Sequence, residues 1–362
     1  MKILFVLEHY YPYLGGAEKL FQQVAEAFAE DGHQVTIVTT LFKRELPKQE
    51  MINGVKIHRL ACQSRFLFTF LSMPLVWKHA SSTDLLITTT YNAALPSWII
   101  GKLRRKKTIL VFHEYWGKLW FSLPYLNLFQ QTMFFAYEWL IIHLPFYQYI
   151  AVSKSTQQRL IGVGVPRKRI SQIYNGIDYN SFRSYPWAPQ GDFTLLYYGR
   201  LGISKGLNLL LPAWKAFKEL GYTGQLQLVI PKYPQLLYRE VCDMIRKLNF
   251  SGGDVQLFHE LEEHILFTQV SKAHAVIIPS YSEGFCFVAV ETMAIGTPII
   301  SSGKGSLKEV VNGTFIEIRE LTTEGILEAL EKSIKGDWLH TPNQLFPLEE
   351  ARKKYIQLIS QI

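Results

Sequence analysis

Residues 1–40 are MKILFVLEHYYPYLGGAEKLFQQVAEAFAEDGHQVTIVTT, and they decide the fold class. The apolar run 3–7 predicts a buried strand, which a polar and aromatic loop, 8–14, follows. Apolar residues then recur at steps of three and four over 17–30, which predicts an amphipathic helix that ends at Gly32. Residues 35–39 predict a second strand. A strand, a helix and a strand in this order predict a right-handed crossover in a parallel sheet.

The same alternation continues along the chain and then restarts. Strands are predicted at 85–88, 108–112 and 149–152, and residues 180–192, with two prolines and a glycine, predict a linker. Further strands are predicted at 194–198, 226–230, 255–258, 275–279, 298–301 and 314–318, and helices at 206–220, 322–334 and 348–362. The sequence therefore predicts two doubly wound, Rossmann-like α/β domains, with the ligand site in the cleft between them, at the carboxyl ends of the strands.

Composition agrees with globular domains. The chain has 362 residues, of which 48% are hydrophobic and 19% are charged, as in domains with full cores. Cys62, Cys242 and Cys286 are odd in number and far apart, which argues against disulfides or a zinc site and favours a reducing compartment. No segment is long and apolar enough to span a bilayer. The first apolar run resembles the start of a signal peptide, but it is too short and is interpreted as a strand.

Charge is unevenly distributed. Residues 1–185 carry 21 Lys and Arg against 11 Asp and Glu, whereas the remainder carries 17 against 19. One interpretation is ordinary variation of a solvated surface. The other is a first domain that faces an anionic partner such as phospholipid.

A pair of glycines, Gly15 and Gly16, lies between the first strand and its helix. Glycine allows the backbone to approach a ligand closely, and the N-terminus of the following helix attracts anions. The pattern differs from the dinucleotide fingerprint GxGxxG, and a plain tight turn explains it equally well.

Residues 199–206, GRLGISKG, follow the first strand of the second domain. They place Arg200 and Lys205 in the loop that opens a helix. The guanidinium of Arg200 and the ammonium of Lys205, beside a helix N-terminus, would suit the binding of a diphosphate. The alternative interpretation is that both are ordinary solvated cations of a loop.

Residues 282–291, SEGFCFVAVE, hold the carboxylates Glu283 and Glu291. On a continuous helix the two would lie on roughly one side, about 12 Å apart in rise. A glycosidase pair of carboxyls is closer, at roughly 5–10 Å. The spacing therefore suits a helix whose first turn contacts one end of a ligand and whose body reaches another part. Two surface glutamates are a poor alternative, because the intervening residues are apolar and predict a buried segment.

Taken in order, these three motifs resemble the family 4 glycosyltransferases of the GT-B fold. The resemblance covers nearly the whole chain, including Asn175 to Asp178 before the linker. It implies an N-terminal acceptor-side domain, 1–180, a nucleotide-sugar donor domain, 181–345, and a C-terminal helix, 346–362, that crosses back to the first domain. His113, after the strand 108–112, matches the active-site histidine of the family.

The resemblance also implies residue roles. Arg200 and Lys205 hold the donor diphosphate, Glu283 and the backbone after it meet the sugar hydroxyls, and Glu291 binds the ribose. The implied catalytic residues are His113 and Glu283, and the implied donor-binding residues are Gly16, Arg200, Lys205, Gly284, Phe285, Cys286 and Glu291. The implied reaction retains the anomeric configuration. No Asp-x-Asp motif is present, so we expect no metal and no cofactor, and cations stabilise the departing diphosphate.

One departure from the family lies in the third motif, where Cys286 stands at a position that is usually glycine. The added side chain beside the sugar pocket could change donor choice. A cysteine at a helix start can also have a lowered pKa, although nothing else indicates a catalytic role.

The acceptor is suggested by a long aromatic stretch. From residue 119 to residue 153, only Glu138 is charged, while eleven aromatic residues occur. A second apolar stretch, 66–77, adjoins Arg65 and Lys78, and residues 104–107 are all basic. Thick helices that cover a sheet are one explanation. Docking at an anionic membrane surface is the other, which favours a lipid-linked or glycan acceptor and a cytoplasmic protein, peripheral on the inner face of the membrane.

Other functions remain open. A nucleotide-sugar epimerase or a phosphorylase-like enzyme could share the scaffold, but nothing marks a lysine for pyridoxal phosphate. A non-catalytic partner protein would not need Glu283 or Lys205, and both are present. Nucleic-acid binding is suggested by the basic first half alone, and no recognition motif supports it.

Overall fold

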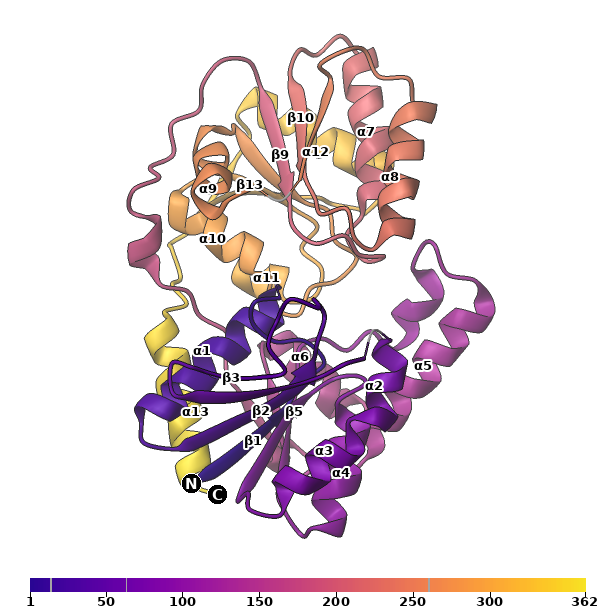
Figure 1. Ribbon diagram of the computed structural model, residues 1–362. Coiled ribbons are helices and arrows are strands. Elements are labelled where there is room, and N and C mark those ends of the chain that lie inside the picture. The colour runs from indigo at the N-terminus through magenta and orange to yellow at the C-terminus, as the bar shows by residue number, and fades with distance from the viewer. Residues whose placement is uncertain (14, 63, 260) are drawn as a thin grey trace. The chain divides into compact units, whose positions relative to one another are not determined.

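The computed structural model describes residues 1–13, 15–62, 64–259 and 261–362. Leu14, at the end of the predicted loop 8–14, lies outside these ranges. The chain divides into two compact units (Figure 1). The first unit is Met1–Trp120, Leu128–Gly176 and Leu348–Ile362, and the second unit is Phe121–Asn127 and Ile177–Pro347.

The first unit is built on an eight-stranded sheet in the order β3-β4-β2-β1-β5-β6-β7-β8. All its neighbouring strands are parallel except β3, which runs antiparallel to β4. Strands β1, β5 and β6 are almost wholly buried. The strands are β1 (Lys2–Val6), β2 (Gln34–Thr40), β3 (Gln49–Ile52), β4 (Val55–Leu60), β5 (Leu85–Thr89), β6 (Lys107–Phe112), β7 (Gln148–Ala151) and β8 (Ile170–Gln172).

Helices cover the first sheet. They are α1 (Gly16–Glu30), α2 (Arg65–Leu71), α3 (Met73–Ala80), α4 (Ala94–Leu103), α5 (Leu128–His143), α6 (Lys154–Gly162) and α13 (Leu348–Ser360), with 3-10 turns η1 (Gly117–Ser122) and η2 (Arg167–Arg169). The predicted apolar stripe of α1 is confirmed, because Phe21 and Phe28 both pack against Phe5 of β1, with ring centroids 6.1 Å apart in each pair.

The second unit has a seven-stranded sheet in the order β11-β10-β9-β12-β13-β14-β15, in which only β15 is antiparallel to its neighbour. Trp214 and Phe217 of α7 lie fully buried in its core. The strands are β9 (Thr194–Tyr198), β10 (Gln225–Val229), β11 (Val255–Phe258), β12 (Ala275–Ile278), β13 (Ile299–Ser301), β14 (Thr314–Glu317) and β15 (Leu339–His340). The helices are α7 (Leu207–Glu219), α8 (Gln235–Lys247), α9 (Glu263–Lys272), α10 (Phe287–Ile295), α11 (Leu307–Val310) and α12 (Thr323–Lys335), preceded by the 3-10 turn η3 (Tyr179–Phe182).

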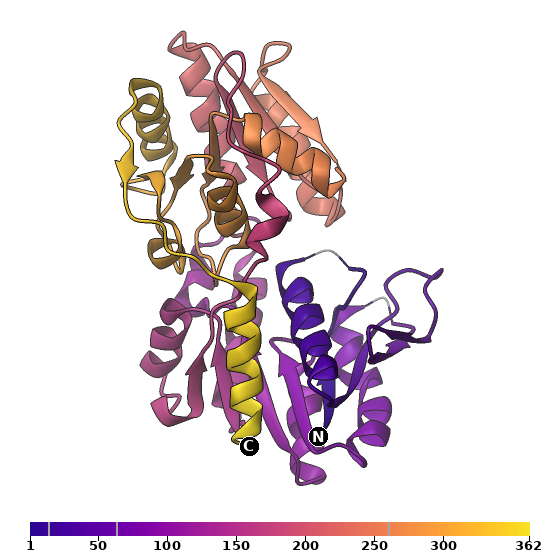
Figure 2. The same ribbon diagram turned by 90° about the vertical axis from the view of Figure 1, so that its left-hand side faces the viewer.

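The predicted fold class is confirmed, including the return of the last helix to the first unit. Helix α13 lies beside α1 (Figures 1 and 2), and Arg352 forms an ion pair with Glu30, 2.7 Å between nitrogen and oxygen. Tyr355 and Ile359 of α13 are buried in this contact.

A hairpin of the first unit, β3 and β4, lies outside the sequence-based predictions. Its turn is Asn53-Gly54, and both residues have positive φ, 48° and 79°. Asn-Gly between two alternating segments is a strong hairpin signal, because both central residues of a type I′ turn need positive φ. The sequence therefore contained this information.

Candidate active site

The first motif of the second unit is the loop 199–206, at the carboxyl end of β9. Gly206 has a φ of 72°, and a Cβ atom placed on it would lie 1.9 Å from the carbonyl oxygen of Pro279. Only glycine fits there, because both the backbone angle and the space exclude a side chain. This close approach brings the loop against the segment that follows β12.

Lys205 and Glu283 meet where these two segments touch. The Lys205 ammonium lies 2.6 Å from Oε1 of Glu283, and the Ser280 hydroxyl donates to the same oxygen, also at 2.6 Å. A backbone hydrogen bond from Tyr281 to the Ser204 carbonyl, 2.7 Å, ties the loops together. The predicted pair of site residues is therefore held as one unit.

Electrostatics keep the Lys205 ammonium charged. Desolvation by itself would lower the pKa of Lys205, but the Glu283 carboxylate outweighs it and leaves that pKa above its ordinary value. Glu283 is 8% exposed. An ammonium has three donors, and its bond to Glu283 uses one of them. Arg200 is exposed in the same loop and adds a second positive charge near Lys205.

The segment after Glu283 differs from the predicted helix. Helix α10 begins only at Phe287, so Glu283, Gly284, Phe285 and Cys286 form a loop that precedes it. The predicted helical separation of about 12 Å between Glu283 and Glu291 is therefore wrong, because helical rise does not apply across a loop. The buried character of both carboxylates is confirmed, since Glu291 is 9% exposed on α10.

Cys286 is the N-cap of α10 and has a φ of 71°, a conformation that favours glycine. Burial, together with the nearby Glu283 carboxylate, raises the pKa of the Cys286 thiol well above its ordinary value. A lowered pKa from the helix start, which the sequence left open, is therefore wrong. The thiol stays protonated near neutral pH, which excludes it as a thiolate nucleophile.

A third loop closes on this site. Gly305, with a φ of 64°, lies so near Glu283 that a Cβ atom would be 2.4 Å from the Glu283 carbonyl oxygen. The Ser306 N–H donates to that same carbonyl at 2.9 Å. Sequence reasoning missed this loop, and its signal was the pair of glycines, Gly303 and Gly305, directly after a predicted strand.

In the first unit, Gly16 and His113 both lie at the carboxyl-end edge of the sheet. Gly16 is the first residue of α1, and Gly15 before it has a φ of −177°, which any residue can adopt. His113 follows β6, and its ring meets Phe21 of α1 edge-on, with centroids 5.5 Å apart. Phe21 lies on the second turn of the helix that Gly16 begins, so this contact positions the His113 ring beside α1.

Behind His113, the segment that follows β6 is held by a buried carboxylate. Glu138 of α5 is 1% exposed. It accepts hydrogen bonds from the backbone N–H groups of Trp116 and Gly117, at 3.0 and 2.7 Å. It also accepts from the Trp120 indole at 3.1 Å and from the Tyr91 hydroxyl at 3.0 Å. Burial raises the pKa of Glu138, and these hydrogen bonds offset part of the increase.

Sequence reasoning did not predict this role for Glu138. The available signal was its isolation, because it is the one charged residue in residues 119–153. A lone carboxylate in an apolar segment needs partners when it is buried.

Glu8, at the carboxyl end of β1, is a second buried carboxylate that the sequence did not single out. Arg65 of α2 forms an ion pair with it, and the Asn92 amide donates to its other oxygen at 3.0 Å. Its carbonyl accepts from the Thr40 hydroxyl at 2.7 Å. These bonds join the ends of β1 and β2 to α2.

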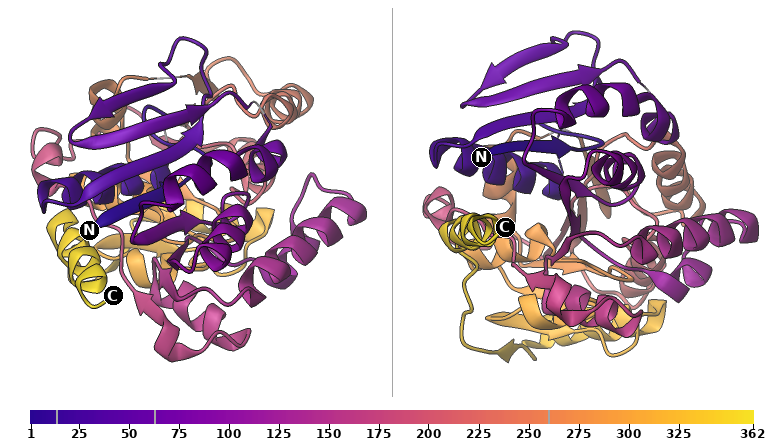
Figure 3. Two further views of the ribbon diagram at one scale, coloured as in Figure 1. Left: turned by 60° about the horizontal axis from the view of Figure 1, so that its bottom comes forward. Right: turned by 90° about the horizontal axis from the view of Figure 1, so that it is seen from below.

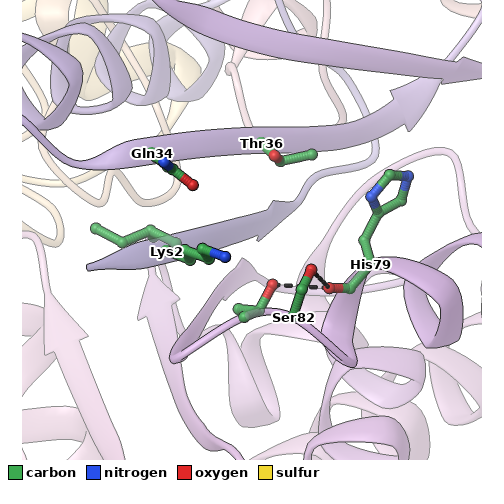
Figure 4. Close-up of a pocket in the computed structure, with 7 residues that line it drawn as sticks. Lys2, Gln34, Thr36, His79 and Ser82 are labelled. Atoms are coloured by element: carbon green, nitrogen blue, oxygen red, sulfur yellow. Dashed lines mark hydrogen bonds between the residues drawn. The ribbon is translucent and has the colours of Figure 1, made fainter.

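A small pocket of about 110 Å³ lies at the opposite edge of the first sheet (Figure 4). Its lining includes Lys2, Gln34, Thr36, His79 and Ser82, near the amino ends of β1 and β2. Ligands of open parallel sheets bind at the carboxyl ends of the strands. This pocket is therefore separate from the candidate site.

Among the described residues, no group of three or more His, Cys, Asp and Glu side chains could hold a metal ion. The expectation that no metal takes part stays a prediction. Within the same part of the chain, no helix is long and apolar enough to cross a membrane.

Known proteins share both sequence and fold with this chain. Residues 14–181 match the family model of Glycosyltransferase Family 4, and residues 181–345 match Glycosyl transferases group 1. One subunit of the phosphatidylinositol N-acetylglucosaminyltransferase of Homo sapiens is 23% identical over 351 residues, which are 92% of this chain and 68% of that protein. An uncharacterised glycosyltransferase of Methanocaldococcus jannaschii is 25% identical over 354 residues, or 87% of this chain and 85% of that one.

Solved structures agree on the fold. Sucrose-phosphate synthase from Thermosynechococcus elongatus has a TM-score of 0.81 at 20% identity, covering 99% of this chain and 98% of that one. HepE of Anabaena, in complex with UDP-glucose, has a TM-score of 0.72 at 18% identity, and the match covers the whole of both chains.

The two α/β units thus have the GT-B fold. More narrowly, the two family models together match residues 14–345, and the chain belongs to the family 4 glycosyltransferases.

Proposed function

We propose that this glycosyltransferase moves a hexose from a nucleoside diphosphate donor to a lipid-linked or glycan acceptor, with retention of configuration and without a metal ion. In this proposal Arg200 and Lys205 bind the donor diphosphate, Glu283 to Cys286 meet the sugar, and Glu291 binds the ribose. In the first unit, Gly16 and His113 are the residues proposed for the acceptor side.

The contact between Lys205 and Glu283 carries the proposal. The carboxylate fixes the ammonium at the carboxyl end of β9, at the start of α7, where a diphosphate also gains from the helix N-terminus. Negative charge grows on the diphosphate as the bond to the sugar breaks. A cation that is already in place stabilises that charge without reorganisation.

The names of relatives support the donor and acceptor classes. HepE was solved with UDP-glucose, and a starch synthase with the same fold was solved with ADP and acarbose. The relatives by sequence include a phosphatidylinositol N-acetylglucosaminyltransferase component and a lipopolysaccharide N-acetylglucosaminetransferase. We therefore propose a UDP-sugar as the first donor to test and a lipid-linked acceptor as the first acceptor.

The donor site can be tested by ligand-induced thermal stabilisation with UDP, GDP and ADP, each with and without EDTA. We expect one nucleotide to stabilise the protein equally in both conditions, since binding only the native state raises its stability. Lys205→Ala should abolish this stabilisation. Lys247→Ala on α8, an exposed lysine outside the three loops, is the matched control and should behave as wild type.

Two outcomes would contradict the donor site. If none of the nucleotides stabilises the protein at millimolar concentration, the proposed donor class is wrong. If EDTA removes the stabilisation and Mg²⁺ restores it, the metal-independent mechanism is wrong.

The reaction type needs a separate measurement, because an epimerase would use the same donor. With the donor alone, an epimerase releases free nucleotide and an altered sugar, whereas a transferase needs an acceptor for rapid turnover. NMR of the product's anomeric proton then reports the configuration. Rapid acceptor-independent release would favour the epimerase, and an inverted product would contradict retention.

A further inference from the structure

Helices α2, α3, α4 and α5 lie on one face of the sheet of the first unit, a face that α6 shares. The strand order places the crossovers through α2 and α3, through α4 and through α5 in the same direction, opposite to the crossover through α1. Because such crossovers are right-handed, these helices share a face. Figure 3 shows them together, away from α1 and α13. Thr69 of α2 donates to the Asn92 carbonyl at 3.1 Å and Tyr137 of α5 donates to the Tyr91 carbonyl at 3.3 Å, so both helices are attached to the same segment.

This face exposes large apolar side chains. On the seven-residue helix α2 only Phe68 and Thr69 are buried. On α5 no residue from 128 to 137 is buried, although that segment is rich in aromatic residues. We define the apolar flank as Phe66, Leu67, Phe70, Leu71, Phe129 and Trp139, of which Phe70 is 65% exposed and Phe129 is 77% exposed. A helix that is apolar on all sides is normally buried in protein or in lipid.

Basic side chains lie on helices of the same face, in the last turn of α3 and at the C-terminal end of α4. Residues 65–107 contain seven Lys and Arg and a single acidic residue, Asp84. We call Lys78, Lys102, Arg104, Arg105, Lys106 and Lys107 the basic rim. The Arg104 guanidinium lies 3.7 Å from the ring centroid of the exposed Trp77, and the Lys107 ammonium lies 4.9 Å from that of Tyr147. At this end of the helices, cations thus pack on two exposed aromatic rings, Trp77 and Tyr147.

We propose that this surface docks on an anionic lipid bilayer, with the apolar flank in the headgroup region and the basic rim on the phosphates. The biological purpose of docking rests on the proposed function, since a lipid-linked acceptor must be reached at a membrane. The docking itself needs neither donor nor acceptor. Aromatic side chains favour the membrane interface, and lysine and arginine near it gain from anionic headgroups.

The charge pattern favours a bilayer over a second copy of the chain. A two-fold dimer through this face would bring each apolar flank, with its basic rim, against the same surface of the other copy. Cations of one copy would then face cations of the other, which opposes association. A bilayer of anionic lipid offers a surface of opposite charge and an apolar layer beneath it.

The test is co-sedimentation of the full chain with vesicles of phosphatidylcholine alone and of phosphatidylcholine with about 30% phosphatidylglycerol. We expect binding to the anionic vesicles at about 50 mM NaCl, with release at about 500 mM, because salt screens the basic rim. A double variant, Phe70→Ser with Phe129→Ser, should bind at least about tenfold more weakly. Lys78→Glu with Lys102→Glu should remove the preference for anionic vesicles.

A matched control is Leu220→Ser with Leu236→Ser in the second unit, where both side chains are also exposed, at 59% and 68%. This control should bind vesicles as wild type does. Nucleotide-induced stabilisation, measured on every variant, verifies folding and separates the two hypotheses. A variant that loses vesicle binding but still binds nucleotide bears on membrane docking alone. A variant that loses nucleotide binding but still binds vesicles bears on the donor site alone.

Several outcomes would overturn docking on a bilayer. Docking is refuted if the wild-type protein binds neither vesicle type at low salt. It is also refuted if the control variant and the apolar-flank variant lose vesicle binding to the same extent. A wild-type dimer in solution that the Phe70 and Phe129 changes convert to monomer, without vesicle binding, would assign the surface to a second copy instead.

Discussion

Replacement of Glu138 by glutamine should destabilise the first unit and disturb the segment after His113. In the native protein four donors converge on the Glu138 carboxylate, from Tyr91, Trp116, Gly117 and Trp120. A glutamine of the same shape has only one acceptor oxygen. Its NH₂ group fits best beside the Tyr91 hydroxyl, which can accept, so the Trp116 N–H loses its acceptor.

The size of the effect follows from these bonds. One buried N–H without an acceptor costs about 1–3 kcal/mol, and three charge-assisted bonds become neutral ones at a loss of about 1 kcal/mol each. Part of this loss is offset, because glutamine is neutral and burial disfavours the charged form of Glu138, as its raised pKa indicates. The free energy of unfolding should therefore fall by about 2–4 kcal/mol. For a unit of this size the melting temperature should fall by about 5–15 °C.

Near-ultraviolet circular dichroism during heating is the suitable assay, because Trp116 and Trp120 report on the segment directly. Turnover should also fall, since this segment begins at His113. The control is Glu45→Gln, an exposed carboxylate of the first unit, which should change the melting temperature by no more than about 1 °C. If Glu138→Gln melts like this control, the hydrogen-bond argument is refuted.

Four further predictions concern both units. Lys205→Ala and Glu283→Ala should each reduce turnover by roughly 10²–10³-fold, the scale of one lost transition-state contact, with the fold intact by circular dichroism; near-normal turnover in both would mean that the active site lies elsewhere. Gly206→Ala should lower stability by at least about 3 kcal/mol in urea unfolding, because its Cβ would meet the Pro279 carbonyl and its φ is 72°. Cys286→Gly should keep or slightly raise the melting temperature, whereas Cys286→Val should lower it, because a β-branched residue is strained at a φ of 71°; the opposite order would contradict the strain. Burial and the neighbouring His79 lower the pKa of His58 from 6.5 to about 4. Because the folded protein favours the neutral ring, His58 adds to the free energy of unfolding above pH 6.5, and this contribution is lost as the pH falls towards 4. The pKa shift alone corresponds to about 3 kcal/mol, and solvent screening reduces the expected loss to about 1–2 kcal/mol. Urea titrations at pH 7 and pH 4 should show that His58→Leu loses less stability on acidification than wild type does, and an equal loss would refute this assignment.

Local pattern was enough to predict the main elements of both sheets. The apolar run before Glu8 and the stripe of Leu20, Phe21, Val24 and Phe28 predict β1 and α1 because burial requires those periodicities. The Asn53-Gly54 hairpin was equally predictable. The Glu283 and Glu291 spacing failed, because a period of 3.6 residues was applied to a segment that starts as a loop.

The sequence by itself determined the fold class, the family and the identity of the two charged motifs, since these depend on residues that are close along the chain. Tertiary structure alone decided which motifs meet. Lys205 and Glu283 are 78 positions apart, and they touch because β9 and β12 are neighbours in the sheet, so the loops after them leave the same edge side by side. Likewise, four donors reach Glu138 from 18 to 47 positions away. Contacts of this kind depend on strand order and close packing, which local periodicity does not encode.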